Sequence, residues 1–155
     1  MKKCCAIPHE GAPPVCPMNG LVAKPVARIT VESLVNPEVK LLPQPHYFCE
    51  DPNCDTVYVS TLGDHLITKD QLRVRVGLKE KEDPIPLCYC FGYEKSHVWQ
   101  DIKTKGHTDI PKVITSRVKA GECRCEVTNP SGTCCLGNVY RAVKQAEAMR
   151  QQGLL

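Results

Sequence analysis

Hydrophobic and polar residues alternate along the first half of the chain, a pattern typical of half-buried β-strands. The alternation is clearest over residues 24–34 (KPVARITVESL) and over 72–76 (LRVRV). Two shorter β-prone runs, 47–49 (YFC) and 57–59 (VYV), flank a turn at 50–53 (EDPN), which together predict a compact hairpin. The pattern therefore predicts a small β-rich unit.

In the second half the apolar residues recur at helical spacing instead. This spacing predicts helices over 93–105, 109–120 and about 136–151; Gly106 and Gly121 end the first two, and Thr108 is the expected N-cap of the second. The expected inner faces of the second and third helices are Ile110, Val113, Ile114 and Val118, and Leu136, Val139, Tyr140 and Val143.

A charged stretch with two prolines, 79–86, lies between the two patterns and is expected to be a linker or a sheet edge. We therefore expect an α+β fold of two units. Residues 1–83 form the β-rich unit and residues 84–155 form the helical domain.

Cysteine is the feature of the composition that needs an explanation, since 11 of the 155 residues are cysteines. The basic start of the chain, Met1 to Cys5, is followed by prolines and a histidine rather than by the apolar region of a signal peptide, and no apolar run approaches the roughly 20 residues of a membrane helix. A cytoplasmic protein without membrane insertion is expected. In that reducing compartment many cysteines indicate metal binding rather than disulfides.

Charge and the remaining motifs weigh against other classes of protein. The net charge is +3, and no basic run with interleaved aromatic residues occurs, so nucleic acid is not an expected partner. There is no Ser/His/Asp set, paired-carboxylate motif or phosphate-binding glycine loop, which favours a protein that is not an enzyme. The histidines, His46 among them, are expected to be surface or capping residues, and the oligomeric state stays open.

Six cysteines of the second half occur as close pairs in turns and at expected helix starts. A two-iron cluster needs four thiolates, and a helix N-terminus supplies unpaired N–H groups and positive potential to such an anionic group. Zinc is the main rival occupant, because four cysteines suit both. The pairs are Cys88 and Cys90, Cys123 and Cys125, and Cys134 and Cys135.

The segments 88–90 (CYC) and 125–135 (CEVTNPSGTCC), with a two-helix spacer between them, resemble the N-terminal iron–sulfur domains of CopZ-type copper chaperones and, more distantly, bacterioferritin-associated ferredoxins. The resemblance implies a ferredoxin-like [2Fe-2S] domain. It maps the cluster ligands onto Cys88, Cys90, Cys125 and Cys135, with Cys123 an alternative to Cys125 and Cys134 an alternative to Cys135.

The first half carries cysteines at zinc-knuckle spacing. Cys49 and Cys54 are separated by four residues within the predicted hairpin turn, and Cys16 is half of a second knuckle. Asn19 stands where a full CxxC motif would place its second cysteine, and an amide is a poor zinc ligand. The resemblance implies one zinc ion here, and Cys4, Cys5, His9 or a ligand from outside the chain is expected to complete the site.

What the resemblance implies for function is redox and metal handling: one-electron transfer, reduction of Cu(II), or delivery of copper to a copper-transporting ATPase or another copper or redox protein. Cys4 and Cys5 form a vicinal pair suited to Cu⁺, which prefers thiolates. The copper-binding MxCxxC loop of the CopZ chaperones does not occur in this sequence. The alternatives are a zinc-only structural, interaction or nucleic-acid-binding module, and an iron–sulfur redox sensor.

Overall fold

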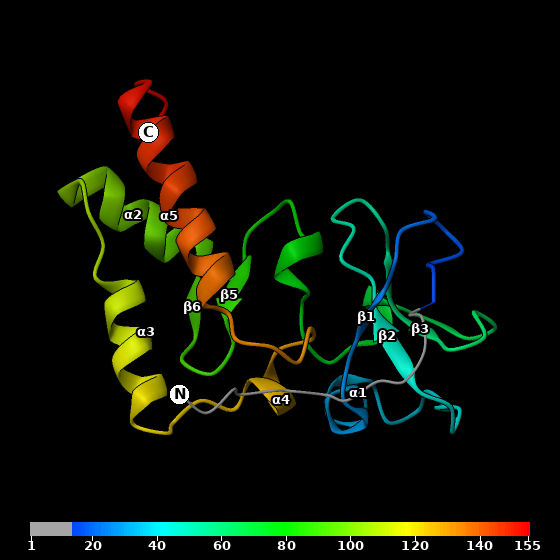
Figure 1. Cartoon of the computed structure of the whole chain (residues 1–155). Helices are drawn as coiled ribbons and strands as arrows, with labels where there is room; N and C mark the ends of the chain where they lie inside the picture. The colour runs from blue at the N-terminus through cyan, green and yellow to red at the C-terminus, as the bar shows by residue number, and fades with distance from the viewer. Residues whose placement is uncertain (1–13) are drawn as a thin grey trace.

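The computed structural model describes residues 14–155, which form an α+β fold, as predicted. A four-stranded antiparallel sheet lies on one side of the molecule, and helices α2, α3 and α5 lie on the other (Figure 1). The strands follow the order of the chain: β1 (Lys24–Pro25), β2 (His46–Phe48), β3 (Thr56–Ser60) and β4 (Leu66–Thr68).

The β2–β3 hairpin confirms the prediction for the two runs on either side of the turn at 50–53. Tyr47 of β2 pairs with Val59 of β3 in antiparallel register. Every residue of β3 is buried, because one face of the sheet packs on the first hydrophobic core and the other on the cysteines described below. The hairpin therefore carries Cys49 and Cys54 at its tip.

The predicted strand over 24–34 is wrong: only β1 is extended, and α1 (Arg28–Leu34) follows it. Thr30, Val31 and Leu34 are buried at helical spacing, whereas Ile29, which the alternation placed on the same face as Val31, is 52% exposed. Packing of this one buried face overrides the modest β preference of Ile, Thr and Val.

The strand predicted over 72–76 is also absent. Leu72 makes a single bridge to Val35, and the chain then bends toward the 3₁₀ helix η2 (Gly77–Lys79). A second 3₁₀ helix, η1 (Lys69–Gln71), precedes Leu72. Leu72 and Val76 are buried, so their apolar character reflects the core rather than a strand.

The second half begins with a short hairpin of β5 (Pro86–Cys88) and β6 (Tyr93–Glu94) and continues as helices. Gly106 and Gly121 follow the first two helices with positive φ, and the last helix has the predicted bounds. The helices are α2 (Lys95–Lys105), α3 (Ile110–Lys119), the short α4 (Cys125–Thr128) and α5 (Leu136–Gln151).

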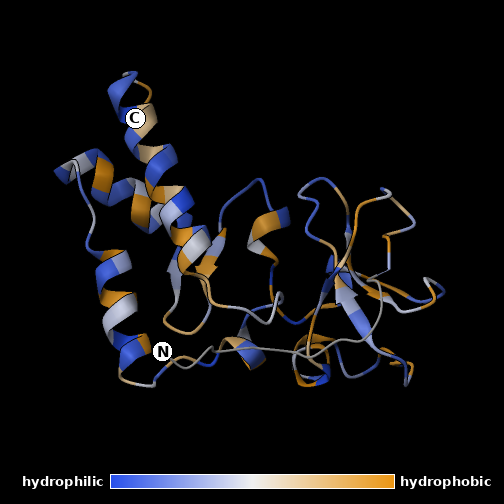
Figure 2. Ribbon diagram, in the orientation of Figure 1, coloured by the Kyte–Doolittle hydropathy of each residue, from blue (hydrophilic) through white to orange (hydrophobic). Residues whose placement is uncertain are grey.

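The helices enclose a second hydrophobic core, and hydrophobic and hydrophilic bands alternate along them in Figure 2. Two predicted inner-face residues prove to be exposed, Val113 at 39% and Tyr140 at 50%. The buried face of α3 is instead Ile110, Pro111 and Ile114, and that of α5 is Val139, Ala142 and Ala146. Within residues 14–155, no helix combines the length and apolar character that crossing a bilayer requires.

Helices α1 and α4 lie side by side along one edge of the molecule (Figure 1), and their contacts join the two halves of the chain. The Thr30 hydroxyl donates to the carbonyl of Glu126 at 2.5 Å, and the Tyr58 hydroxyl donates to that of Pro130 at 2.6 Å. Gly132 has a φ of +69°, and a Cβ there would lie 3.0 Å from Thr30 Oγ1. The first half therefore supports the segment that carries Cys125 and Cys135.

Candidate metal centres

The first group of thiols lies at the end of the sheet. The Sγ atoms of Cys16, Cys49 and Cys54 all lie within 4.8 Å of one another. Thiolates bound tetrahedrally to zinc, with Zn–S bonds of about 2.3 Å, are about 3.8 Å apart, so these donors fit a zinc ion after small shifts. Cys16 and Cys49 are buried and Cys54 is half-buried.

Two tight turns bring these thiols together. The N–H of Gly20 donates to the carbonyl of Cys16 at 2.8 Å, and the positive φ of Gly20 closes that turn. In the β2–β3 hairpin, the carboxylate of Asp51 accepts from the N–H of Asn53 at 2.9 Å, so the chain reverses between Cys49 and Cys54. Each turn thus directs its cysteines toward the same point.

Asn19 takes part in this centre as a hydrogen-bond donor. Its amide donates to Cys49 Sγ at 3.2 Å and to a carboxylate oxygen of Asp51 at 3.1 Å. From the sequence, Asn19 was expected only to be a poor zinc ligand. A donor to a ligand sulfur stabilises the negative charge that the sulfur carries when it binds a metal, so the amide suits a metal-bound Cys49.

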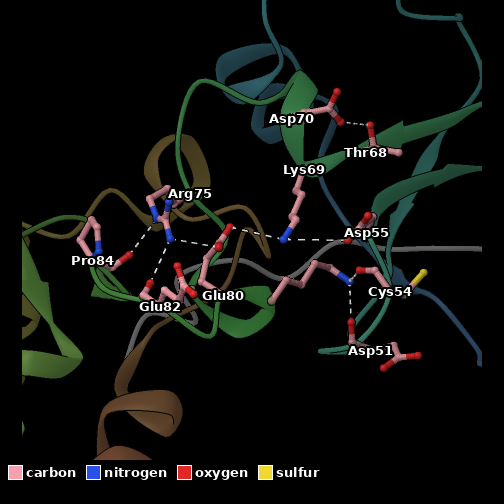
Figure 3. A network of polar contacts seen from close by, with 12 residues as sticks. Asp51, Cys54, Asp55, Thr68, Lys69, Asp70, Arg75, Glu80, Glu82 and Pro84 are labelled. Atoms are coloured by element: carbon pink, nitrogen blue, oxygen red, sulfur yellow. Dashed lines mark hydrogen bonds and ion pairs between the residues drawn. The ribbon is translucent and has the colours of Figure 1, made fainter.

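Lys79 is a second residue that the sequence did not indicate. It is 3% exposed although it lies in the stretch expected to be a linker, and its ammonium donates to the carbonyls of Asp51 at 2.7 Å and Cys54 at 3.0 Å. Figure 3 shows Asp51 and Cys54 at one end of a polar network whose other members include Glu80 and Arg75. The network fixes the turn that carries Cys54.

The remaining ligands expected for this site, Cys4, Cys5 and His9, lie outside the described residues. Among the described cysteines, burial raises the pKa of Cys16. Burial also acts to raise the pKa of Cys54, but hydrogen bonds from Thr56 and the other thiols outweigh it, so the pKa is lowered.

The second group of thiols lies where the hairpin of the second half meets the helices. Cys88 ends β5, Cys90 lies in the turn after it, Cys125 begins α4, and Cys135 directly precedes α5. Cys90 Sγ lies 3.5 Å from Cys125 Sγ, and Cys88, Cys90 and Cys135 belong to or pack against the second hydrophobic core. The four candidate cluster ligands thus come from three segments to one region of the fold, but among the described residues only Cys16, Cys49 and Cys54 form a group whose sulfurs all lie within 4.8 Å of one another.

Hydrogen bonds shift the ionisation of these thiols. The bond from Cys135 lowers the pKa of Cys88 to about 7 and that of Cys125 to about 6, against the opposing effect of burial. The same bonds raise the pKa of Cys135, the donor. The backbone N–H of Arg124 donates to Cys90 Sγ at 3.1 Å. Two thiols are therefore close to ionised at neutral pH, which suits iron or zinc.

The alternative ligands differ from this group in exposure. Cys134 is exposed and Cys123 is half-buried, whereas Cys125 and Cys135 are 3% and 2% exposed. The choice of Cys125 and Cys135 as ligands stays a prediction. Four cysteines, with a backbone N–H that reaches the sulfur of one of them, are the number and kind of groups that a [2Fe-2S] cluster needs.

Tyr89, which stands between Cys88 and Cys90, connects the second group with the first half. Its hydroxyl accepts from the N–H of Gly77 at 2.9 Å and donates to the carbonyl of Arg75 at 2.7 Å. This role could not be predicted from the sequence, because a single tyrosine between two cysteines belongs to no periodic pattern of apolar residues. The turn between the two cysteines is therefore held by hydrogen bonds to residues of the first half, Arg75 and Gly77.

Known proteins are similar to this chain, and one family model covers the first of the two centres. A family model described as a zinc binding domain, of the CopZ type, matches residues 13–73. The copper chaperone CopZ of Archaeoglobus fulgidus is 34% identical over 96 residues, which are 61% of this chain and 44% of that protein. The chain therefore matches less than half the length of this curated relative.

A solved structure is also similar. The X-ray structure of the Archaeoglobus fulgidus CopZ N-terminal domain has a TM-score of 0.65 and 30% sequence identity. The match covers 82% of this chain and 95% of that domain, so it includes both halves of the fold.

Proposed function

This chain belongs to the family of CopZ N-terminal domains, and from this we propose that it is a non-catalytic protein of copper handling that binds zinc and a [2Fe-2S] cluster. The observation that carries the proposal is that the fold brings four cysteines from three segments to one region, with Cys90 Sγ and Cys125 Sγ 3.5 Å apart and Cys88, Cys125 and Cys135 buried. Burial of cysteines as small apolar side chains does not account for such convergence.

A [2Fe-2S] cluster in this position supplies one-electron chemistry. The residues of the chain set the conditions for it. The Arg124 N–H donates to a ligand sulfur, and the 16-residue helix α5 begins directly after Cys135, so its unpaired N–H groups and the positive end of its dipole lie beside that ligand. These groups stabilise negative charge on the sulfurs, which favours the reduced state.

Zinc has a structural role in this proposal. The sulfurs of Cys16 and Cys49 pack with Val59 as a small core of their own at the end of the sheet. A zinc ion bound there ties the turn at 16–20 to the β2–β3 hairpin, which a sheet of such short strands needs for stability.

Copper is the cargo rather than a resident metal. We propose that a reduced cluster would give one electron to Cu(II) and return to its oxidised state, and that the resulting Cu(I) would be held by thiolates and passed to a copper-transporting ATPase or another copper protein. The cysteines that are neither preferred cluster ligands nor members of the Cys16–Cys49–Cys54 group are Cys4, Cys5, Cys123 and Cys134. Basic side chains of the second half, including Lys95, Arg124 and Arg141, suit an acidic surface on the partner.

Anaerobic purification followed by a visible spectrum and a count of iron, sulfide, zinc and copper tests the proposal. The expected protein is brown, with two irons, two sulfides and one zinc, and its cluster accepts one electron reversibly. A colourless protein that takes up two zinc ions and no iron after anaerobic reconstitution would refute the iron–sulfur part and favour a zinc-only module.

A further inference from the structure

Lys79 carries a positive charge in a buried position. Its side chain is 3% exposed, and both acceptors of its ammonium are backbone carbonyls, those of Asp51 and Cys54. A buried cation is costly unless it is hydrogen-bonded and paired with negative charge. Here the carbonyl dipoles supply the hydrogen bonds, and no carboxylate of residues 14–155 forms an ion pair with the ammonium.

The candidate zinc centre supplies negative charge when it is loaded. A Zn²⁺ ion held by three thiolates has a formal charge of about −1, and a fourth thiolate adds another negative charge. Lys79 holds the carbonyl of one of these cysteines, Cys54, and that of Asp51, whose carboxylate shares the Asn19 amide with Cys49 Sγ. The loaded centre therefore stabilises the buried position of Lys79, and Lys79 in turn stabilises the loaded centre.

The segment that carries Lys79 also holds the turn between two candidate cluster ligands. In η2 the N–H of Gly77 donates to Tyr89 Oη at 2.9 Å, and Tyr89 donates to the carbonyl of Arg75 at 2.7 Å. Gly77 lies so close to β5 that a Cβ would come within 1.8 Å of the carbonyl oxygen of Pro86. A shift of Lys79 thus moves the backbone on which Tyr89, between Cys88 and Cys90, depends.

Side chains on both sides of η2 reinforce this link. Glu80 forms ion pairs with Arg75 at 3.1 Å and with Lys69 at 3.9 Å, and Lys69 also faces Asp55, the residue after Cys54 (Figure 3). Arg75 donates in addition to the carbonyl of Pro84 at 2.8 Å, just before β5. The segment from Arg75 to Glu80 therefore contacts the turn that carries Cys54 and the turn between Cys88 and Cys90.

We infer that Lys79 and Tyr89 are positioning residues that couple the two centres, so that zinc in the first raises the affinity of the second for its cluster, and the reverse. The inference rests on the proposed function. Coupling between binding sites is reciprocal, so it can be measured as the zinc affinity of protein with and without the cluster.

The test uses the full chain, with zinc affinity determined anaerobically by competition with a chromophoric chelator. We expect zinc to bind at least about fivefold more tightly when the cluster is present. Lys79→Met should bring this ratio close to one, and Lys79→Arg should restore part of it. Lys81→Met is the matched control, since the exposed Lys81 bonds only the side chain of Asn53 at 2.7 Å, and it should keep the ratio of the wild type.

A second variant and a spectroscopic measurement guard against simple misfolding. Tyr89→Phe removes one oxygen atom and should lower the ratio of zinc affinities with and without the cluster. In addition, removal of zinc should change the visible circular dichroism of the cluster in the wild type but not in Lys79→Met. A ratio of one in wild-type protein with both metals bound, or an unchanged ratio in both Lys79→Met and Tyr89→Phe, would overturn the coupling alone. Failure to take up iron would overturn the proposed function along with it.

Discussion

At the scale of single residues, hydrogen bonds reach most of the candidate ligand sulfurs. The Asn19 amide donates to Cys49 Sγ, the Arg124 N–H donates to Cys90 Sγ, and hydrogen bonding among the thiols lowers the pKa of Cys88 and of Cys125. Donors to a ligand sulfur spread the negative charge that a bound metal leaves on it. The two centres are therefore organised by donors as well as by cysteines.

Burial separates the cysteines that the sequence left as alternatives, and this leads to a prediction. Cys125→Ser should abolish the visible absorption of the cluster, because Cys125 is buried and touches both Cys90 and Cys135. Cys123→Ser should retain the absorption, and iron content should follow the same order. Loss of the cluster with Cys123→Ser alone would assign that ligand to Cys123.

His46 shows the limit of reading single residues from the sequence, since it was expected at the surface and is 2% exposed. Its Nε2 lies 3.1 Å from Nδ1 of His65. Burial lowers the pKa of His46 below its usual value of 6.5, the charges of His65 and Arg28 lower it further, and Asp64 opposes them. The unfolded chain therefore binds this proton more readily than the folded chain.

The consequence is a loss of stability in weak acid. The contribution of His46 to the free energy of unfolding is fully present above about pH 6.5 and declines as the pH falls toward the lowered pKa of the folded state. His46→Gln should flatten this part of the pH profile in denaturant unfolding of zinc-loaded protein. Thiol protonation affects both proteins alike, so equal slopes for the two would contradict the prediction.

At the scale of elements, the sequence predicted what depends on local signals. The β2–β3 hairpin and the bounds of α5 follow from a turn motif and from helical spacing. The strands expected over 24–34 and 72–76 are absent because contacts distant in sequence decide there: Thr30 of α1 bonds Glu126, and Leu72 bridges Val35. Cysteine spacing likewise pointed to both groups of thiols but not to Asn19, Lys79 or Tyr89, whose roles arise only in three dimensions.

The turn at 16–20 offers a prediction at this scale. Asn19→Ala removes the donor to Cys49 Sγ and frees the Asp51 carboxylate beside the thiolates, so zinc should bind about tenfold more weakly. Competition with a chelator measures the change. Met18→Ala is a suitable control, because Met18 lies in the same turn and is 67% exposed, and it should leave the affinity unchanged.

For the whole molecule, the contact between the two halves determines how far they act as one unit. Tyr58 lies in the sheet, is fully buried, and donates to the carbonyl of Pro130 between Cys125 and Cys135. This hydroxyl links the first hydrophobic core, to which Tyr58 belongs, to the segment between Cys125 and Cys135. The stability of the second half should therefore depend on a residue of the first.

Tyr58→Phe tests this dependence. It leaves the buried carbonyl of Pro130 without its donor, so the free energy of unfolding should fall by about 1–3 kcal/mol. Denaturant unfolding measures the loss, and amide exchange should rise at 129–132 as well as in β3. Tyr140→Phe changes an exposed hydroxyl and should have no comparable effect. A loss confined to the sheet would mean that the halves are independent.

The vicinal pair Cys134 and Cys135 is chemically unequal, because the first is exposed and the second is buried against the other thiols. A thiol-reactive probe therefore meets Cys134 first, and the natural chain carries an attachment point beside its second metal centre. A fluorophore or spin label placed there would follow the arrival of metals and partners in real time, while the sulfurs of Cys88, Cys90, Cys125 and Cys135 stay unmodified.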